Sequence, residues 1–196
     1  MKKTQKTVRK RAGDAAKPKH QPAAIDRPGT WHLARSETER QLSDFEFRLE
    51  RLAQAYYRWK AACLAAVCDV PLTGDDVAVL NVVRMGDEPK RLSEVGQLLN
   101  RVDVPNLQYA ARKLVRSGLI ETEGGSSRKE TRYRATATGR SITEDYAALR
   151  AATLPPMLDA LDGWAATSVT TGLHLDLISG LYAQAAQVAI TRRHQP

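Results

Sequence analysis

Residues 91–134 read RLSEVGQLLNRVDVPNLQYAARKLVRSGLIETEGGSSRKETRYR, and this stretch decides the fold. Its first part places apolar residues at helical spacing, which predicts a short helix with one buried stripe. The stripe consists of Leu92, Val95, Leu98 and Leu99. Gly96 lies inside this helix at a cost of about 1 kcal/mol relative to Ala, so we expect a second helix to cross closely there. Residues 100–102 then form the turn between the two helices.

The second helix is predicted to begin near Asp103, whose carboxylate can accept a hydrogen bond from an exposed amide of the first turn. Pro105 fits that turn, because amides there have no acceptor within the helix. Apolar residues recur at positions i, i+3, i+4 and i+7 and define one buried face. These residues are Leu107, Ala110, Ala111 and Leu114.

The opposite face of the second helix is rich in groups that recognise DNA. At 100° per residue it contains Pro105, Tyr109, Arg112 and Arg116, flanked by Asn106, Gln108 and Lys113. Arg can bond guanine through two hydrogen bonds, Asn and Gln can bond adenine, and Lys or Tyr can hold phosphates. The pattern therefore predicts base reading by Asn106, Gln108, Tyr109 and Arg112, and phosphate contacts by Lys113, Arg116 and Arg132. A solvated charged face is the alternative interpretation.

A β-hairpin is predicted directly after this helix. Ser117-Gly118 can end the helix, since glycine adopts the left-handed conformation of a C-terminal cap. Residues 119–122 and 131–134 have the β-branched and aromatic content of strands, and a Gly-Gly loop with a basic tip separates them. Arg128 and Lys129 at that tip are expected to reach a minor groove. Helix, turn, helix and hairpin in this order indicate a winged helix-turn-helix.

Two further segments resemble the MarR family of bacterial winged-helix regulators. KLVRSGLIE at 113–121 is similar to that family's passage from recognition helix to wing, and ATATGRS at 135–141 is similar to its Leu-Thr-x-x-Gly element, with Gly139 matching and Ala135 in place of Leu. Residues 127–129 keep the Arg of the family's Asp-Arg-Arg wing tip and lack its Asp. The resemblance covers roughly residues 40–190. It implies a mainly α fold with a small β-hairpin wing, in which residues 71–140 form the DNA-binding head of a MarR-like domain at 36–196.

The head is expected to begin with another capped helix. Thr73-Gly74-Asp75-Asp76 provides a cap followed by acidic residues in the first turn, which favours a helix start. Val77, Leu80 and Val83 form the inner face of this helix, and Gly86 can close it.

Long amphipathic helices are predicted on both sides of the head, at 36–70 and 141–196. From Glu37 to Cys68, apolar residues repeat at three- and four-residue steps, and a second stripe runs from Leu173 to Val188. Leu154-Pro155-Pro156 is expected to end the helix that precedes that second stripe. Because a small head cannot bury both stripes, mutual packing in a homodimer is the simplest solution. Two recognition helices would then lie about one turn of DNA apart.

The N-terminal 35 residues carry the entire net charge of the chain, which is +8. They contain ten Lys or Arg and two Asp, whereas the remaining chain has 20 basic and 20 acidic residues. Few apolar residues and several prolines predict a disordered basic tail over 1–35. Such a tail attracts phosphates in a salt-sensitive way. A solubilising segment or a contact with a membrane surface is the alternative.

Catalytic and metal-binding patterns are missing from the sequence. The four His lack metal-ligand spacing, and there is neither a phosphate-binding loop nor a nucleophile elbow. We therefore expect no enzyme activity, no metal and no cofactor. The tail has neither a long apolar run nor an amphipathic pattern, which favours a cytoplasmic bacterial protein over a secreted or imported one.

Two further sets of residues have alternative interpretations. Cys63 and Cys68 lie five residues apart on one helix, so a mutual disulfide is not expected. Cys63 is either a redox sensor, as in some MarR-like regulators, or a buried small hydrophobe. Tyr56, Tyr57 and Trp59 either line the pocket in which the family binds small-molecule effectors or serve core and interface packing.

Together these patterns predict a homodimeric, cytoplasmic transcription regulator that binds double-stranded DNA, without a membrane partner. Repression from a pseudo-palindromic operator is the expected output. A winged-helix protein-interaction module and a non-specific architectural protein driven by the basic tail are the two alternatives.

Overall fold

The computed structural model describes residues 32–125 and 130–192. The elements follow in the order α1 (Glu37–Ala65), α2 (Gly74–Arg84), β1 (Lys90–Arg91), α3 (Leu92–Leu98), α4 (Val104–Arg116), β2 (Ile120–Glu123), β3 (Arg132–Ala135), α5 (Ala137–Asp159) and α6 (Trp164–Arg192). The chain divides into two units, of which one spans Pro28–Met157 and the other includes Leu158–Pro196. Most of the predicted basic tail, together with Arg128 and Lys129, lies outside the described residues.

The fold is mainly helical with one small antiparallel sheet, as the sequence predicts. The sheet has the strand order β1-β3-β2, and Lys90 pairs with Tyr133 while Thr122 pairs with Tyr133 from the other side. The two predicted strands are present, shifted by one residue. The short strand β1 was not predicted, because two residues are too few to show an alternating pattern.

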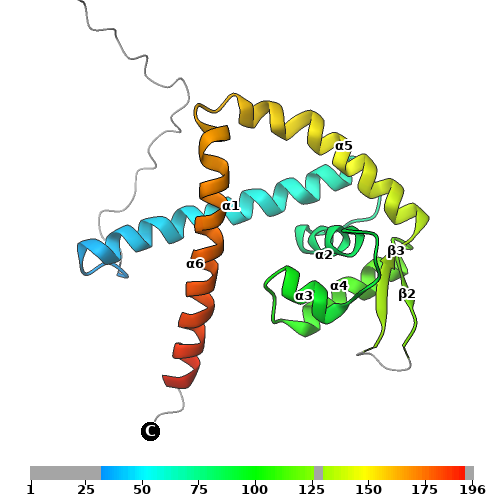
Figure 1. The fold of residues 1–196 in the computed structure, drawn as a ribbon, viewed down its shortest axis with the longest axis horizontal. Helices are drawn as coiled ribbons and strands as arrows, with labels where there is room; N and C mark the ends of the chain where they lie inside the picture. The colour runs from blue at the N-terminus through cyan, green and yellow to red at the C-terminus, as the bar shows by residue number, and fades with distance from the viewer. Residues whose placement is uncertain (1–31, 126–129, 193–196) are drawn as a thin grey trace, which may run out of the picture. The chain divides into compact units, whose positions relative to one another are not determined.

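α2, α3 and α4 lie beside the strands and form the head with them (Figure 1). The predicted inner faces are confirmed, since the head's core comprises Val77, Leu80, Val83, Val95, Leu107, Ala110, Ala111, Leu114, Leu119 and Ile120. Leu98 is an exception, because its side chain is 55% exposed. At 100° per residue Leu98 lies to one side of the face that contains Leu92, Val95 and Leu99, and it is the last residue of α3.

Close backbone contacts fix the helices of the head. A Cβ on Gly96 would lie 3.0 Å from Leu107 of α4, so the predicted close crossing of the two helices is confirmed. A Cβ on Gly74, the first residue of α2, would lie 2.6 Å from the carbonyl oxygen of Tyr57 in α1. α2 therefore begins directly against the backbone of α1, with Thr73 and Asp76 forming a capping box at that start.

Helix α4 is followed directly by a glycine that ends it, as predicted. Gly118 has a φ of +68°, its amide donates to the carbonyl of Val115, and the Leu119 amide donates to that of Leu114. These two bonds form a Schellman motif, which turns the chain sharply into β2. Position 139 also requires glycine, because a Cβ there would lie 1.9 Å from the carbonyl oxygen of Leu119. The start of α5 is thereby packed against the start of β2.

The prediction that Leu154-Pro155-Pro156 ends a helix was wrong, because α5 runs through both prolines to Asp159. The prolines remove amide donors only from the last two turns of α5. The carbonyls that lose the usual amide donor four residues on belong to Ala151 and Ala152, which are exposed and can be hydrated. The break falls instead at residues 160–163, where Gly163 has a φ of +78°.

α6 is a single long helix, described here by itself. In the part of the chain that the structure describes, none of its residues is buried, and Leu173, Leu177 and Leu181 of the predicted stripe are each at least 60% exposed. Across residues 32–125 and 130–192, no helix combines the length and the apolar character needed to cross a membrane.

Candidate nucleic-acid interface

The outer face of α4 is open to solvent, as the helical pattern predicts. The side chain of Tyr109 is 57% exposed, and Asn106, Arg112 and Arg116 are exposed on either side of it. Gln108 is half-buried. Among the described residues, Arg112 and Arg116 have no ion-pair partner, so both guanidinium groups are available to an anionic ligand.

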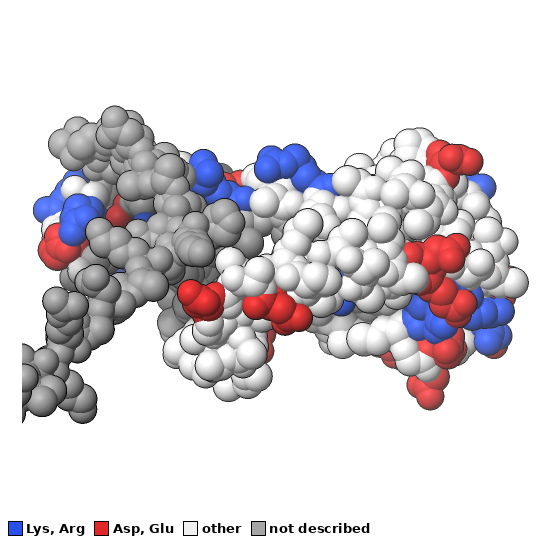
Figure 2. Space-filling view, turned by 90° about the horizontal axis from the view of Figure 1, so that it is seen from above, with Lys and Arg blue, Asp and Glu red and all other residues white. Residues whose placement is uncertain are grey.

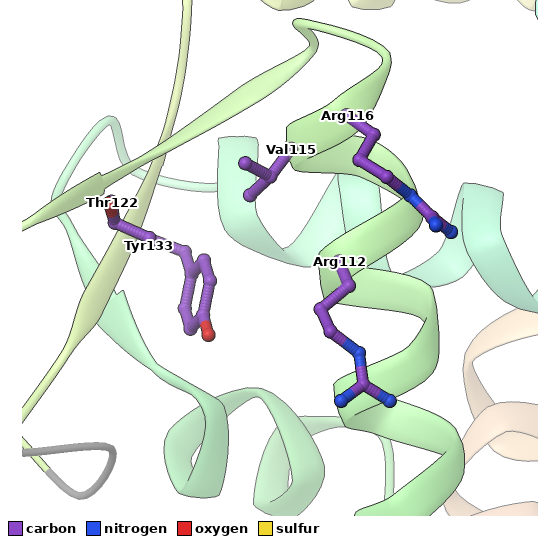
Figure 3. Close-up of a pocket in the computed structure, with 5 residues that line it drawn as sticks. All are labelled: Arg112, Val115, Arg116, Thr122 and Tyr133. Carbon is purple, nitrogen blue, oxygen red and sulfur yellow. The ribbon is translucent and has the colours of Figure 1, made fainter.

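A groove separates this face of α4 from the hairpin. It has a volume of about 260 Å³ and is lined by Arg112, Val115, Arg116, Thr122 and Tyr133. In Figure 3, Val115 points from α4 toward the strands, and the ring of Tyr133 points from β3 into the space beside α4. Thr122 and Tyr133 are cross-strand partners, so the pairing of β2 with β3 places both on this side of the hairpin. The side chains of Arg112, Val115 and Arg116 thus line this groove from α4, and those of Thr122 and Tyr133 line it from the hairpin, while the guanidinium group of Arg116 extends away from Tyr133 in Figure 3.

Lys113 differs from its neighbours, because it does not extend outward. Its Nζ lies 2.7 Å from Oδ2 of Asp76 in α2, and the side chains are 22% and 5% exposed respectively. The same carboxylate oxygen accepts hydrogen bonds from the amide and the hydroxyl of Thr73. Lys113 therefore connects α4 to the capped start of α2, and its charge is compensated inside the protein.

Asp103 occupies the N-cap position of α4 but does not cap it, contrary to the prediction. No amide of the first turn donates to its side chain. Both carboxylate oxygens instead accept from Arg101, at 2.9 Å from Nε and 2.6 Å from Nη2. Oδ2 also accepts from Nδ2 of Asn106 at 3.1 Å. Hydrogen bonds from Arg101 and then Asn106 hold the pKa of the Asp103 carboxyl well below its usual range.

In the hairpin, Arg132 and Arg134 point to different partners. Nη1 of Arg132 donates to the carbonyl of Pro89 at 3.0 Å, so one nitrogen of the guanidinium group of this half-buried side chain is already engaged. Arg134 pairs with Glu123 across the strands at 3.2 Å. The remaining cations predicted for the wing, Arg128 and Lys129, lie outside the described residues.

The three aromatic residues of α1 that were considered as a possible effector pocket, Tyr56, Tyr57 and Trp59, are not gathered in one pocket. Trp59 packs on Tyr146 of α5, with ring centroids 6.2 Å apart. Tyr56 and Tyr57 instead flank Lys60, whose Nζ lies 4.5 Å and 3.8 Å from their ring centroids. Lys60 is only 4% exposed, and burial lowers the pKa of its ammonium group. Lys60 was not among the predicted site residues, although its spacing of four and three residues from the tyrosines places all three on one helix face.

A second, wider groove of about 570 Å³ lies between α1 and the start of α2. Tyr57 lines it together with Arg58, Thr73, Gly74 and Asp75, among others.

Cys63 faces the core, where burial raises the pKa of its thiol, and both Cys63 and Cys68 are free thiols. The geometry of Cys63 thus agrees with its interpretation as a buried packing residue.

Charge on the surface is mixed outside α4. Figure 2 shows acidic and basic residues intermingled on the part of the visible surface near the strands, and both signs of charge occur elsewhere on the described surface as well. No cluster of three or more potential metal ligands occurs within the described ranges. The exposed guanidinium groups of α4, beside its groove, are therefore the feature that points to an anionic polymer as ligand. Sequence reasoning had not placed Val115, Thr122 and Tyr133 in that site, because only the packing of the hairpin against α4 brings them together.

Comparisons with known proteins address the same region. Residues 72–139 match the family of winged helix DNA-binding domains. By sequence, no curated protein matches the chain. Among solved structures, the fold is similar to that of reduced AbfR bound to DNA, with a TM-score of 0.60 and 17% identity over 74% of this chain and 98% of that one. AbfR is from Staphylococcus epidermidis.

Two further structures are similar at the same level. Sco5413, a MarR family transcriptional regulator from Streptomyces coelicolor, has a TM-score of 0.57 and 20% identity over 71% of this chain and 96% of that one. MosR from M. tuberculosis in complex with DNA has a TM-score of 0.55 and 17% identity over 73% of this chain and 97% of that one. Residues 72–139 are therefore similar to winged helix DNA-binding domains, and the chain has the fold of the MarR family regulator Sco5413 and of the other structures named here.

Proposed function

We propose that this protein is a sequence-specific transcription regulator that binds double-stranded DNA as a homodimer and represses the promoter it occupies. The observation that carries this proposal is the outer face of α4, where an exposed tyrosine lies among exposed amide and guanidinium groups. A helix about 10–12 Å across with its side chains fits the major groove, and its N-terminal residues then meet base edges. The similar structures of AbfR and MosR, which are bound to DNA, support the same use of the fold.

In this proposal the residues divide by the part of the DNA they contact. Asn106, Gln108, Tyr109 and Arg112 read base edges, while Arg116 and Arg132 contact phosphates. The groove beside Tyr133 receives the sugar-phosphate backbone between the two grooves of the duplex, and Arg128 with Lys129 reaches the minor groove. Lys113 is reassigned from a phosphate contact to a structural role, because its ammonium group is paired with Asp76.

Exposed apolar residues support a homodimer. Leu173, Leu177 and Leu181 of α6 and Leu42 and Leu52 of α1 are all at least 50% exposed. Such long apolar stripes are costly in water, and a second copy of the chain can cover them symmetrically. A dimer also provides two recognition helices for the two halves of a pseudo-palindromic site. We place this dimer in the bacterial cytoplasm. A small-molecule effector in the groove beside Tyr57 would bind near α2, through which α4 is anchored.

Binding to the DNA upstream of the protein's own gene tests this proposal. We expect tight binding that resists non-specific competitor DNA and weakens with salt. A full-length variant with the Lys and Arg of residues 1–35 replaced by Gln should lose affinity and keep its sequence preference. Loss of all binding in that variant would instead support the architectural alternative. No binding by either protein would favour the protein-interaction module.

A further inference from the structure

The start of α4 contains a chain of hydrogen bonds that ends on a proposed base-reading residue. Arg101 donates to Asp75 through Nη1 at 3.1 Å and to Asp103 through Nε and Nη2. Asp103 in turn accepts from Asn106 at 3.1 Å. The first turn of α2, the turn before α4 and the exposed face of α4 are thus joined through four side chains.

Arg101 is the fixed point of this chain. Its side chain is 17% exposed, and the planar guanidinium group binds Asp103 through two parallel hydrogen bonds. The third bond, to Asp75, attaches the same group to α2. The guanidinium group cannot rotate without breaking its hydrogen bonds to both Asp75 and Asp103, so the carboxylate of Asp103 is held in one orientation. Both acidic partners also compensate the charge of Arg101, which distinguishes it from Arg112 and Arg116.

The orientation of Asp103 determines which way the amide of Asn106 points. A carboxylate only accepts hydrogen bonds, so the nitrogen of the Asn106 amide, and not its oxygen, must face Asp103. The carboxyl stays ionised at neutral pH, because its pKa is well below the usual range. One N–H of Asn106 is thereby occupied, and Oδ1 with the second N–H remains for a ligand. This acceptor beside a donor matches the N6 and N7 atoms of adenine in the major groove.

We propose that Arg101 and Asp103 are positioning residues that fix the amide of Asn106 as a reader of adenine. The inference rests on the proposed function, since it requires α4 to lie in a major groove. It adds two residues that contact no base and yet determine sequence preference. It also explains why the residue at the N-cap of α4 is an aspartate whose side chain does not cap the helix.

The test uses duplexes that the full-length protein selects from a pool with a random central segment. We expect the selected duplexes to carry an adenine at one position of each half-site. Asn106→Ala should reduce the preference for adenine at that position by about 5- to 150-fold, the range of one bidentate base contact. Asp103→Ala should lose discrimination at the same base pair by at least about five-fold. Its affinity for unselected DNA should rise, because one negative charge is lost and Arg101 is released toward the phosphates.

Asp103→Asn removes the same charge and keeps an oxygen that can accept from Asn106, but it cannot accept both hydrogen bonds of Arg101, and its own nitrogen can turn toward Asn106. Its loss of discrimination should therefore be smaller than that of Asp103→Ala. The matched control is Glu121→Ala, which removes one negative charge from an exposed residue of β2 outside this chain of hydrogen bonds and should leave the discrimination unchanged. A purely structural role of Asp103 would weaken binding to all sequences and lower the thermal midpoint, without affecting one base pair selectively. Unchanged preference in Asp103→Ala, or a selected base other than adenine, would overturn the inference alone. If the original protein selects no sequence, the proposed function fails with it.

Discussion

The ion pair of Lys113 and Asp76 allows a direct comparison between a structural and a DNA-contacting cation on the same helix. In Lys113→Met, the stem of the side chain is kept and the ammonium group is removed. Breaking a buried ion pair costs about 3–5 kcal/mol. Here the carboxylate keeps two hydrogen bonds from Thr73, and Lys113 is 22% exposed. We therefore expect the free energy of unfolding to fall by about 1–3 kcal/mol, as measured by urea denaturation.

Arg116→Ala, one turn further along α4, is the matched control. Arg116 is exposed, so its removal should change the free energy of unfolding by less than about 0.5 kcal/mol. It should lower the slope of log affinity for DNA against log salt by about 0.9, the value for one lost phosphate contact. Lys113→Met should leave that slope unchanged. A reduced slope together with unaltered stability in Lys113→Met would show that the lysine contacts phosphate and that the reasoning is wrong.

Three further predictions concern packing and assembly. Gly139→Ala should destabilise the protein by about 1–3 kcal/mol in urea, because the clash with the Leu119 carbonyl outweighs the helix propensity of alanine, whereas exposed Thr138→Ala should be nearly neutral. Equal stability of the two variants would contradict the close approach at Gly139. Iodoacetamide at neutral pH should label half-buried Cys68 before buried Cys63, as followed by mass spectrometry, and the reverse order would contradict the burial of Cys63. Leu177→Glu should shift the protein from dimer to monomer in analytical ultracentrifugation, and an unchanged dimer would exclude this stripe from the interface.

Much of the head could be predicted from the sequence, because its signals are local. The buried face of α4 follows from the spacing of its apolar residues, and Gly118 ends the helix through its own backbone conformation. The exposure of Tyr109 and Arg112 follows from the same helical geometry. Such features need no knowledge of distant residues, which is why they are confirmed.

Features that depend on distant partners could not be predicted in this way. A helical wheel places Lys113 at the edge of the exposed face, but a long side chain follows its partner, and Asp76 lies on another helix. Asp103 fits the usual pattern of a capping residue, yet Arg101 competes for its carboxylate. Pro155 is a strong local helix breaker whose cost is small where water can replace the lost donor.

The central claim, that α4 reads DNA sequence, is tested most directly by the effect of Arg112→Ala on discrimination between two duplexes. One duplex carries the sequence selected by the full-length protein, and the other carries the same bases in scrambled order. The account predicts that the original protein prefers the selected duplex and that Arg112→Ala loses about 1–3 kcal/mol of this preference, with little change in affinity for the scrambled duplex. Equal affinity of the original protein for both duplexes, or an unchanged preference in Arg112→Ala, would contradict it.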